Sequence, residues 1–260
     1  MARAEHRRLW PILGLSGLLG CAQGPFVRPG PTAWPEPPAR VHVQVQGTFN
    51  EEGSALMPVV DEPSVGFYYR SKAGARVDEA ESLAGSLEIE AAMAAHEAEL
   101  HAILAAKHPV VISAYSQGSC VALDLIGRLE PSELDQVEWL VLISPAFRVD
   151  WAWRPRKRGY ARRMEQHCAR ARDRLLAAME SESAARGGES NEALARLILE
   201  RSFIADVDHD RIVEPGHDGL PIERRFMQAG THAGWVAGKG LPYLELIAKI
   251  DALTGSAPSR

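Results

Sequence analysis

The sequence predicts an α/β domain in which a mostly parallel sheet is covered by helices on both faces. Its 260 residues are 46% hydrophobic and 24% charged, which suits a globular chain with a substantial core and excludes collagen-like, coiled-coil and wholly disordered proteins. From residue 41 onward, strand patterns alternate with helix patterns. Two continuous apolar runs, 109–113 and 137–144, are typical of strands buried on both faces of a parallel sheet.

The first elements of the domain follow from local pattern. Residues 41–45 alternate apolar and polar side chains, and Gly47 follows, which predicts a strand that ends in a tight loop. A second short strand is expected at 65–69. Apolar residues at helical spacing then predict a long helix over about 78–107.

The middle of the chain contains the central strands. The run 109–113 is the best candidate for a central strand, and 137–144 is the next. A helix is expected between them, over 116–130. The order strand, helix, strand is that of a parallel unit with a crossover helix.

The C-terminal half contains an inserted segment. Apolar side chains recur on one face of a helix over 159–182, and a second helix is expected over 191–199 after a Gly-rich loop. We expect the segment 147–199 to form a helical cap insertion. Two strands and a closing helix complete the domain, at 203–207, 225–229 and 241–253.

The inserted segment carries a concentration of positive charge. Between Arg154 and Arg174 there are nine basic residues and only two acidic ones. Such a face suits anionic lipid headgroups or an anionic substrate, and a solvated cationic helix face is an equal alternative.

The N-terminal stretch predicts export. Three arginines precede the uncharged apolar run Leu9–Gly20, which indicates a signal peptide over 1–20 and is too short for a transmembrane helix. The run ends at Cys21, as in the lipobox of bacterial lipoproteins, so Cys21 is the expected lipidation site and the membrane an expected partner. Six prolines make 21–40 an extended tether. An ordinary cleaved signal peptide, or a start codon assigned too far upstream, is the alternative.

Charge and cysteine content exclude several classes of protein. A formal charge of −5 argues against a nucleic-acid binder that works through overall positive charge. The three cysteines show no metal-ligand spacing and are too few for a disulfide framework. We expect Cys120 and Cys168 to be small buried hydrophobic residues.

Ser116 is the candidate nucleophile. The sequence Ala114-Tyr115-Ser116-Gln117-Gly118 follows a predicted buried strand and opens a helix, with small residues two before and two after the serine. This is the context of a nucleophile elbow, although alanine replaces the first glycine of the G-x-S-x-G pattern. The alternative is a serine that caps the helix.

A serine nucleophile needs a base and an acid that orients the base. In the order Ser…Asp…His, the acid belongs on the loop after a late strand, where Asp210 is our choice and Asp208 the runner-up. A solvated acidic loop or a cation site is the alternative. His232 follows the last predicted strand and is the expected base, ahead of His209 and His217 on other late loops.

The oxyanion of the tetrahedral intermediate needs backbone donors. The N–H of Gln117, directly after the serine, supplies one by position. The loop after the first strand is the expected source of the other, from Thr48 or Phe49.

Together, Ser116, Asp210 and His232 resemble the catalytic residues of the α/β-hydrolase superfamily across about residues 41–253. The run Tyr115-Ser116-Gln117-Gly118 is similar to the elbow of cutinase-like esterases, whose disulfides this sequence does not copy. The resemblance implies a serine hydrolase of carboxylic esters or thioesters that needs no metal or organic cofactor. A non-catalytic binding module of the cell envelope, a peptidase and an acyltransferase are the alternatives.

Overall fold

The computed structural model describes most of the predicted domain. Described are residues 38, 40–45, 47, 63–67, 86–149, 158–180, 189–216, 218–231 and 241–255. Several predictions therefore lie outside the described residues, namely the signal peptide, Cys21, Thr48, Phe49, His217 and His232.

Six strands form one sheet, and every neighbouring pair is parallel. Their order across the sheet is β2-β1-β3-β4-β5-β6. The chain passes from β1 to the edge strand β2, returns to β3 on the other side of β1, and then adds strands in sequence as far as β6 at the opposite edge. The strands are β1 Val41–Val45, β2 Ser64–Phe67, β3 Val110–Tyr115, β4 Val137–Ile143, β5 Ser202–Val207 and β6 Arg225–Gln228. The predicted parallel sheet is confirmed, with boundaries shifted by a few residues at most.

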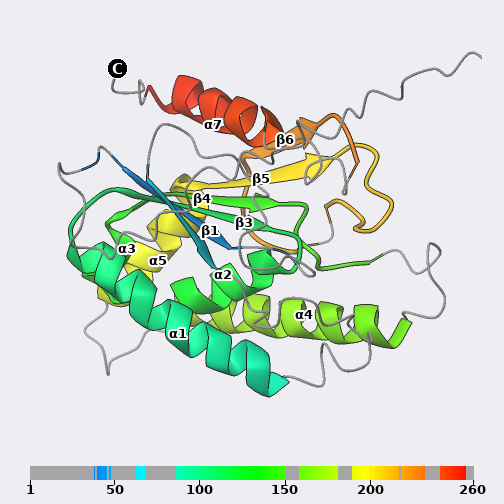
Figure 1. Ribbon diagram of the computed structural model, residues 1–260, viewed down its shortest axis with the longest axis horizontal. Coiled ribbons are helices and arrows are strands. Elements are labelled where there is room, and N and C mark those ends of the chain that lie inside the picture. Colours follow the sequence, from blue (N-terminus) through cyan, green and yellow to red (C-terminus); the bar gives the residue numbers. More distant parts are fainter. Residues whose placement is uncertain are drawn as a thin grey trace, which may run out of the picture.

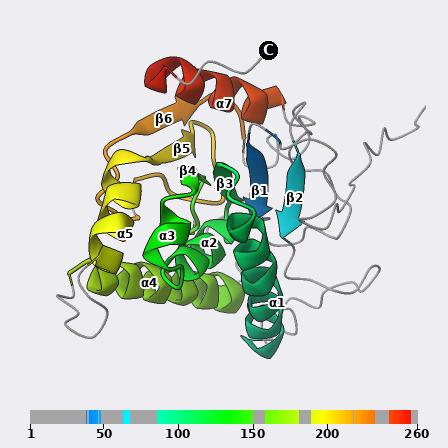
Figure 2. The same ribbon diagram turned by 90° about the vertical axis from the view of Figure 1, so that its left-hand side faces the viewer.

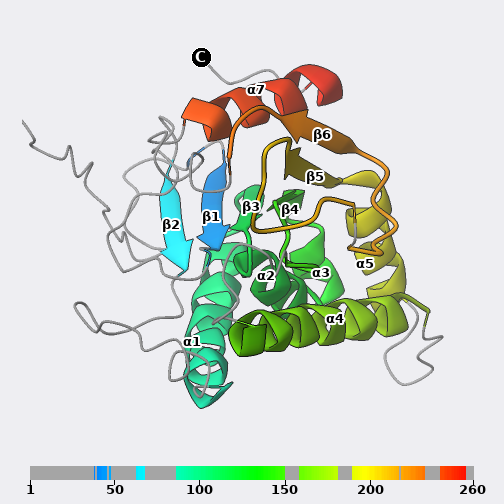
Figure 3. The same cartoon turned by 90° about the vertical axis from the view of Figure 1, so that its right-hand side faces the viewer.

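Helices cover both faces of the sheet, as predicted. Among the described helices, Figures 1 and 3 show α7 on one face and the others on the opposite face. The helices are α1 Ser86–Ala105, α2 Gly118–Ile126, α3 Pro131–Leu134, α4 Arg158–Glu180, α5 Glu189–Glu200 and α7 Leu241–Thr254. The predicted helix over 116–130 is the shorter α2. It is followed by α3, which the sequence analysis did not predict and which begins with a capping box between Glu130 and Glu133.

Strand alternation divides the core into two clusters. Val41, Val43 and Val45 of β1 belong to the larger cluster, which joins the sheet to α1, α2, α4 and α5. The smaller cluster joins β3, β4 and β5 to α7, with Tyr243 fully buried at its centre. β3 is buried along its whole length, which explains why its sequence is a continuous apolar run.

One prediction about the cysteines is wrong. Cys120 in α2 and Cys168 in α4 are both fully buried, and they form a disulfide with a Cα–Cα distance of 4.8 Å. The bond joins two helices that pack against each other although the cysteines are 48 positions apart. Spacing along the chain carries no signal for this contact, because only the packing of α4 on α2 creates it.

The inserted segment packs on the helix-rich face. α4 lies against α2, and Leu175 and Ala171 from one face of α4 are buried in the larger core cluster. Arg172 donates to the carbonyl of Asp218, and Gly219 lies against the same guanidinium group. The predicted cap comprises 147–199; its helices α4 and α5 contribute buried residues to the larger core cluster, and residues 150–157 and 181–188 lie outside the described residues, so a cap over the site stays a prediction.

The folded part begins earlier than the predicted end of the tether. Arg40 is only 7% exposed and forms an ion pair with Asp251 of α7. Arg40 precedes β1, so it marks the amino edge of the parallel sheet. Within the described part of the chain, no helix combines the length and apolar character needed to cross a membrane.

Candidate active site

Ser116 occupies a strained turn between β3 and α2. Its φ is +55°, a left-handed value that non-glycine residues rarely adopt. Backbone hydrogen bonds hold the turn, because the Ser116 N–H donates to the carbonyl of Ile143 at 2.8 Å and the Ala146 N–H donates to the carbonyl of Ser116 at 3.3 Å. The side chain is 6% exposed. Local chain geometry therefore fixes the direction of this serine.

The helix-capping alternative does not fit the start of α2. The N-cap residue of α2 is Gln117, and no side chain makes a capping hydrogen bond there. The carbonyl of Ser116 accepts from the Ser119 N–H at 3.1 Å, which closes the first turn. Ser116 thus precedes the N-cap residue and is not itself the helix cap. Its backbone conformation, and not the helix, sets the direction of its side chain.

Gly47 brings the loop after β1 against this turn. A Cβ at position 47 would lie 2.9 Å from Cδ1 of Tyr115 and 3.2 Å from Cβ of Ser116, so only glycine fits without displacement. β1 and β3 are neighbours in the sheet, and their carboxyl ends meet at this point. Thr48 and Phe49, the predicted oxyanion donors, follow directly in the chain and lie outside the described residues.

Asp210 is fixed on the loop after β5. Its Oδ1 accepts hydrogen bonds from the backbone N–H groups of Ile212 at 2.8 Å and Val213 at 2.9 Å. Burial, and then the negative charge of Asp210, raise the pKa of the Tyr115 phenol.

Asp208 has a different environment from Asp210. Its Oδ1 accepts from the Gly230 N–H at 2.9 Å, which ties the loop after β5 to the turn after β6. Its Oδ2 lies 3.8 Å from Nε2 of His209, whose side chain is 76% exposed. The partner of His209 is therefore Asp208, and both residues belong to the rim.

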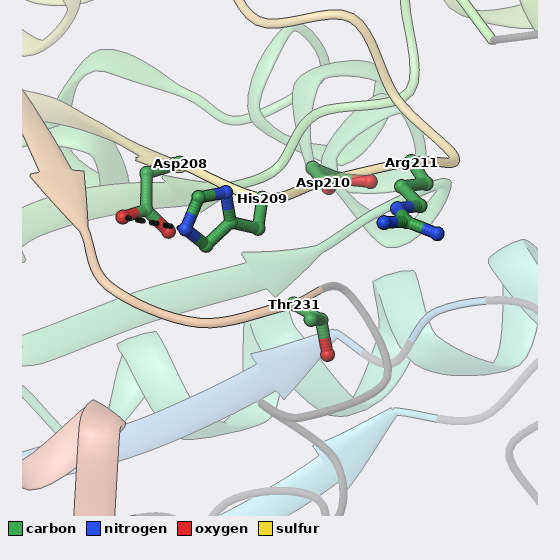
Figure 4. Close-up of a pocket in the computed structure, with 5 residues that line it drawn as sticks. All are labelled: Asp208, His209, Asp210, Arg211 and Thr231. Atoms are coloured by element: carbon green, nitrogen blue, oxygen red, sulfur yellow. Dashed lines mark ion pairs between the residues drawn. The ribbon is translucent and has the colours of Figure 1, made fainter.

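A pocket of about 640 Å³ lies between the two loops. Figure 4 shows His209 turned toward Asp208 and Thr231 on the opposite wall. Thr231 is the residue before His232, so the acid loop and the start of the predicted base loop line one pocket. The lining residues are Asp208, His209, Asp210, Arg211 and Thr231.

The sequence analysis missed a buried cluster of charged side chains close to the loop that carries Asp210. Asp218 accepts from both terminal nitrogens of Arg225, at 2.9 and 2.8 Å, and from the Leu220 N–H at 2.9 Å. Burial raises the pKa of Asp218, but the hydrogen bonds from Arg225 and Leu220 outweigh burial and lower it overall. Burial raises the pKa of nearby Asp206, and Arg225 only partly offsets this effect. The sequence analysis contained no signal for the pairing of Asp218 with Arg225, because folding of the intervening loop brings these side chains together.

The carboxyl edge of the sheet collects the site residues. Ser116 follows β3, Asp210 follows β5 and Thr231 lies three residues after β6, while Gly47 lies beyond β1. The six parallel strands carry helices on both faces, and a serine at left-handed φ directly follows a central strand. The fold is that of an α/β-hydrolase. His232, the predicted base in the order Ser…Asp…His, lies outside the described residues.

Metal ligands do not gather in the described part of the chain. No three His, Cys, Asp or Glu side chains among the described residues are grouped so that they could hold a metal ion.

The comparisons with known proteins found similarity only to solved structures, at low sequence identity. No family model matches the chain, and no curated protein matches it. Carboxyl esterase 2 from Tuber melanosporum is 16% identical, with a TM-score of 0.45, covering 80% of this chain and 75% of its own. A soluble variant of monoglyceride lipase from Saccharomyces cerevisiae is 12% identical, with a TM-score of 0.44, covering 75% and 78%. Human thioesterase 2 is 12% identical, with a TM-score of 0.39, covering 85% and 99%.

Proposed function

We propose that this protein is a serine hydrolase that cleaves carboxylic esters or thioesters with Ser116 as nucleophile. The observation that carries the proposal is the left-handed φ of +55° at Ser116, at the exit of a buried central strand and in contact with the Gly47 loop. Strain of this kind persists where the surrounding structure enforces it, which is typical of functional sites.

The proposed chemistry runs in two halves. His232 removes the proton of the Ser116 hydroxyl while the oxygen attacks the ester carbonyl, and then returns that proton to the departing alcohol or thiol. Water, deprotonated by the same imidazole, cleaves the acyl-enzyme and releases the acid and free Ser116. No step needs a metal or an organic cofactor.

Backbone donors stabilise the negative oxygen of each tetrahedral intermediate. The Gln117 N–H, at the N-terminus of α2, is one proposed donor, and Thr48 or Phe49 supplies the other. Each such donor contributes roughly 3–4 kcal/mol to transition-state stabilisation. The contact between Gly47 and Ser116 supports this assignment, because it places the start of the second loop beside the nucleophile.

Asp210 is the proposed orienting acid. Two backbone donors hold its Oδ1, and its charge reaches Tyr115 next to the nucleophile. Asp208, in contrast, is committed to Gly230 and lies beside exposed His209. These contacts favour Asp210 as the partner of His232.

Labelling with a fluorophosphonate probe tests the proposal on the chain that starts at residue 21. The wild type should be labelled at Ser116, and Ser116→Ala and His232→Ala should abolish labelling. Asp210→Asn should slow labelling far more than Asp208→Asn does. Ser202→Ala is the matched control. Ser202 is also buried, its hydroxyl donates to the Leu197 carbonyl, and it lies at the start of β5, at the opposite edge of the sheet from Ser116. A folded wild type without labelling would favour a non-catalytic binding module.

A substrate panel separates the enzyme alternatives. We expect carboxylic esters and thioesters to be cleaved faster than the matching amides. Faster amide cleavage would favour a peptidase, and transfer of the acyl group to an added alcohol in preference to water would favour an acyltransferase.

We also propose that the enzyme is exported and held on a membrane by a lipid on Cys21. The Cys120–Cys168 disulfide supports export, since disulfides persist in oxidising compartments. Arg40, the last residue of the predicted tether, lies at the amino edge of the sheet, whereas Ser116 lies at the carboxyl edge. Labelled palmitate should be incorporated by the wild type and not by Cys21→Ser, and incorporation by the variant would contradict the assignment.

A further inference from the structure

The first turns of α4 lie at the same edge of the sheet as the proposed nucleophile. The Val149 N–H, on the loop after β4, donates to Oε1 of Glu165 at 2.7 Å. Further along α4, Cys168 bonds Cys120 near the start of α2, and a later leucine of α4 approaches Gly127 just beyond the end of α2. The two helices therefore run in the same direction, and α4, like α2, begins at the carboxyl edge of the sheet.

A junction of three segments joins this part of α4 to the loop after β5. Val149 forms an antiparallel bridge with Val213, and the Glu214 N–H donates to the Arg148 carbonyl at 2.9 Å. Arg148 and Glu214 also form an ion pair at 2.8 Å. Arg211, two residues before the bridge, lines the pocket. The start of α4 and the pocket thus belong to one end of the molecule.

Three arginines on α4 and beside the pocket are exposed and unpaired. Arg162 and Arg170 lie on the side of α4 opposite its buried stripe, and Arg211 is exposed at the pocket. Figure 4 shows the Arg211 side chain on the side of the pocket away from Asp208. Among the described residues, none of the three side chains has an ion pair or a hydrogen bond. Because a guanidinium group stays charged and carries five N–H donors, all three can bind an external anion.

The lack of partners is specific to this part of the protein. Every other arginine whose side chain the structure describes pairs with a carboxylate or, in the case of Arg224, lies over the ring of Phe203. On α5, for example, Arg196 pairs with Glu192. The segment 154–174 has nine basic and two acidic residues in a chain whose formal charge is −5. Positive charge is therefore concentrated on one part of an otherwise acidic protein.

We propose that Arg162, Arg170 and Arg211 form a docking surface for a bilayer that contains anionic phospholipids, and that docking turns the carboxyl edge of the sheet toward the membrane. Guanidinium groups bind phosphate with two parallel hydrogen bonds. The arginines are spread over α4 and the loop after β5, so a lipid surface, which offers many phosphates at once, fits them better than one small anion does. Resting on the proposed function, the docked enzyme takes its ester substrate from the membrane.

Vesicle binding tests the docking surface in a chain that carries no lipid. The chain from residue 21 with Cys21→Ser is mixed with vesicles of phosphatidylglycerol and phosphatidylcholine in equal parts, or of phosphatidylcholine alone, and bound protein is measured by sedimentation. The test variant carries Arg162→Gln and Arg170→Gln. The control variant carries Arg128→Gln and Arg196→Gln, which remove the same charge from exposed arginines that have partners in the chain.

We expect the wild type to bind the anionic vesicles and not the neutral ones, with an affinity that falls as salt is added. The test variant should bind about thirtyfold more weakly, because it lacks two cations at the anionic surface, and the control variant should stay within about twofold of the wild type. Arg211→Gln alone should weaken binding about fivefold. Ser116→Ala should bind like the wild type, since docking does not use the nucleophile.

Hydrolysis then tests the orientation of the docked enzyme. The rate on a long-chain ester held in the anionic vesicles is divided by the rate on a short soluble ester. This ratio should fall about tenfold or more in the test variant and stay within about twofold in the control variant.

Three outcomes would overturn the inference or a part of it. Equal binding by the test and control variants, or equal binding of the wild type to neutral vesicles, would overturn the docking surface. Weaker binding by the test variant with an unchanged ratio of rates would overturn the membrane as the source of the substrate. Binding to anionic vesicles by a wild type that cleaves neither ester would overturn the proposed function and support the docking surface alone.

Discussion

Arg40 and Asp251 lie 211 positions apart and form a bidentate ion pair, with both nitrogen–oxygen distances at 2.8 Å. The pair joins the residue before β1 to α7, and both side chains are nearly inaccessible to solvent. It therefore anchors the closing helix to the start of the domain. Burial makes the pair sensitive to loss of one partner, because the other charge then stays buried without compensation.

Removal of this arginine should destabilise the domain strongly. Arg40→Ala is expected to lower the free energy of unfolding by about 3–5 kcal/mol, measured by urea titration at neutral pH. Arg196→Ala is the control, because Arg196 forms exposed pairs with Glu192 and Asp135, and its loss should change stability by about 1 kcal/mol or less. Equal effects of the two substitutions would contradict the structural role of the Arg40 pair.

The disulfide between α2 and α4 should be measurable by thiol titration. In a Cys21→Ser chain from residue 21, we expect no titratable thiol in denaturant until a reductant is added, and then two. The double variant Cys120→Ala, Cys168→Ala should lose about 4 kcal/mol of stability, from chain entropy over a separation of 48 residues. Two free thiols in the unreduced, oxygen-exposed protein would refute the bond.

A side chain at position 47 should disturb the nucleophile. Gly47→Ala would place its Cβ 2.9 Å from the ring of Tyr115 and 3.2 Å from Ser116, so the turn must shift. We expect fluorophosphonate labelling of Ser116 to slow by about tenfold or more, since small misplacements of reacting groups reduce rates steeply. At Gly127 a Cβ would come no closer than 3.4 Å to any neighbour, the Leu123 carbonyl, so Gly127→Ala should label at the wild-type rate. Equal rates for the two variants would contradict the contact.

The buried acids near the site should give opposite dependences of stability on pH. Because the pKa of Asp218 is lowered in the fold, its ionised form stabilises the protein above the ordinary aspartate pKa of about 3.9, and this contribution is lost as pH falls. Asp218→Asn should therefore be less stable than the wild type at pH 7, with the difference shrinking toward about pH 3.

Asp206 supplies the matched comparison. Burial raises its pKa, so its ionised form is disfavoured in the fold, and its contribution to stability is lost as pH rises. Asp206→Asn should equal or exceed the wild type in stability at pH 7, measured by urea unfolding, and gain nothing near pH 3. Differences of the same sign and pH dependence for both variants would contradict the assigned environments.

The sequence predicted most of the fold because the relevant signals are local. β1 and β3 were recognisable from alternation and from a continuous apolar run, and the parallel order followed from strands separated by helices. α2 ends at Ile126, four residues before the predicted end of that helix, and α3 was not predicted, since a helix of four residues is too short to show a periodic pattern. The positions of Ser116 and Asp210 after their strands came from motif and chain order, and the roles of His232, Thr48 and Phe49 remain predictions.

The sequence by itself determined the α/β class, the strand order along the chain and the candidate residues at strand exits, because periodicity and turn chemistry act over a few neighbouring residues. Only the tertiary structure decided that Cys120 bonds Cys168, that Arg40 pairs with Asp251 and that Gly47 touches Ser116. These contacts join segments far apart in the chain, where packing, and no local pattern, brings the atoms together.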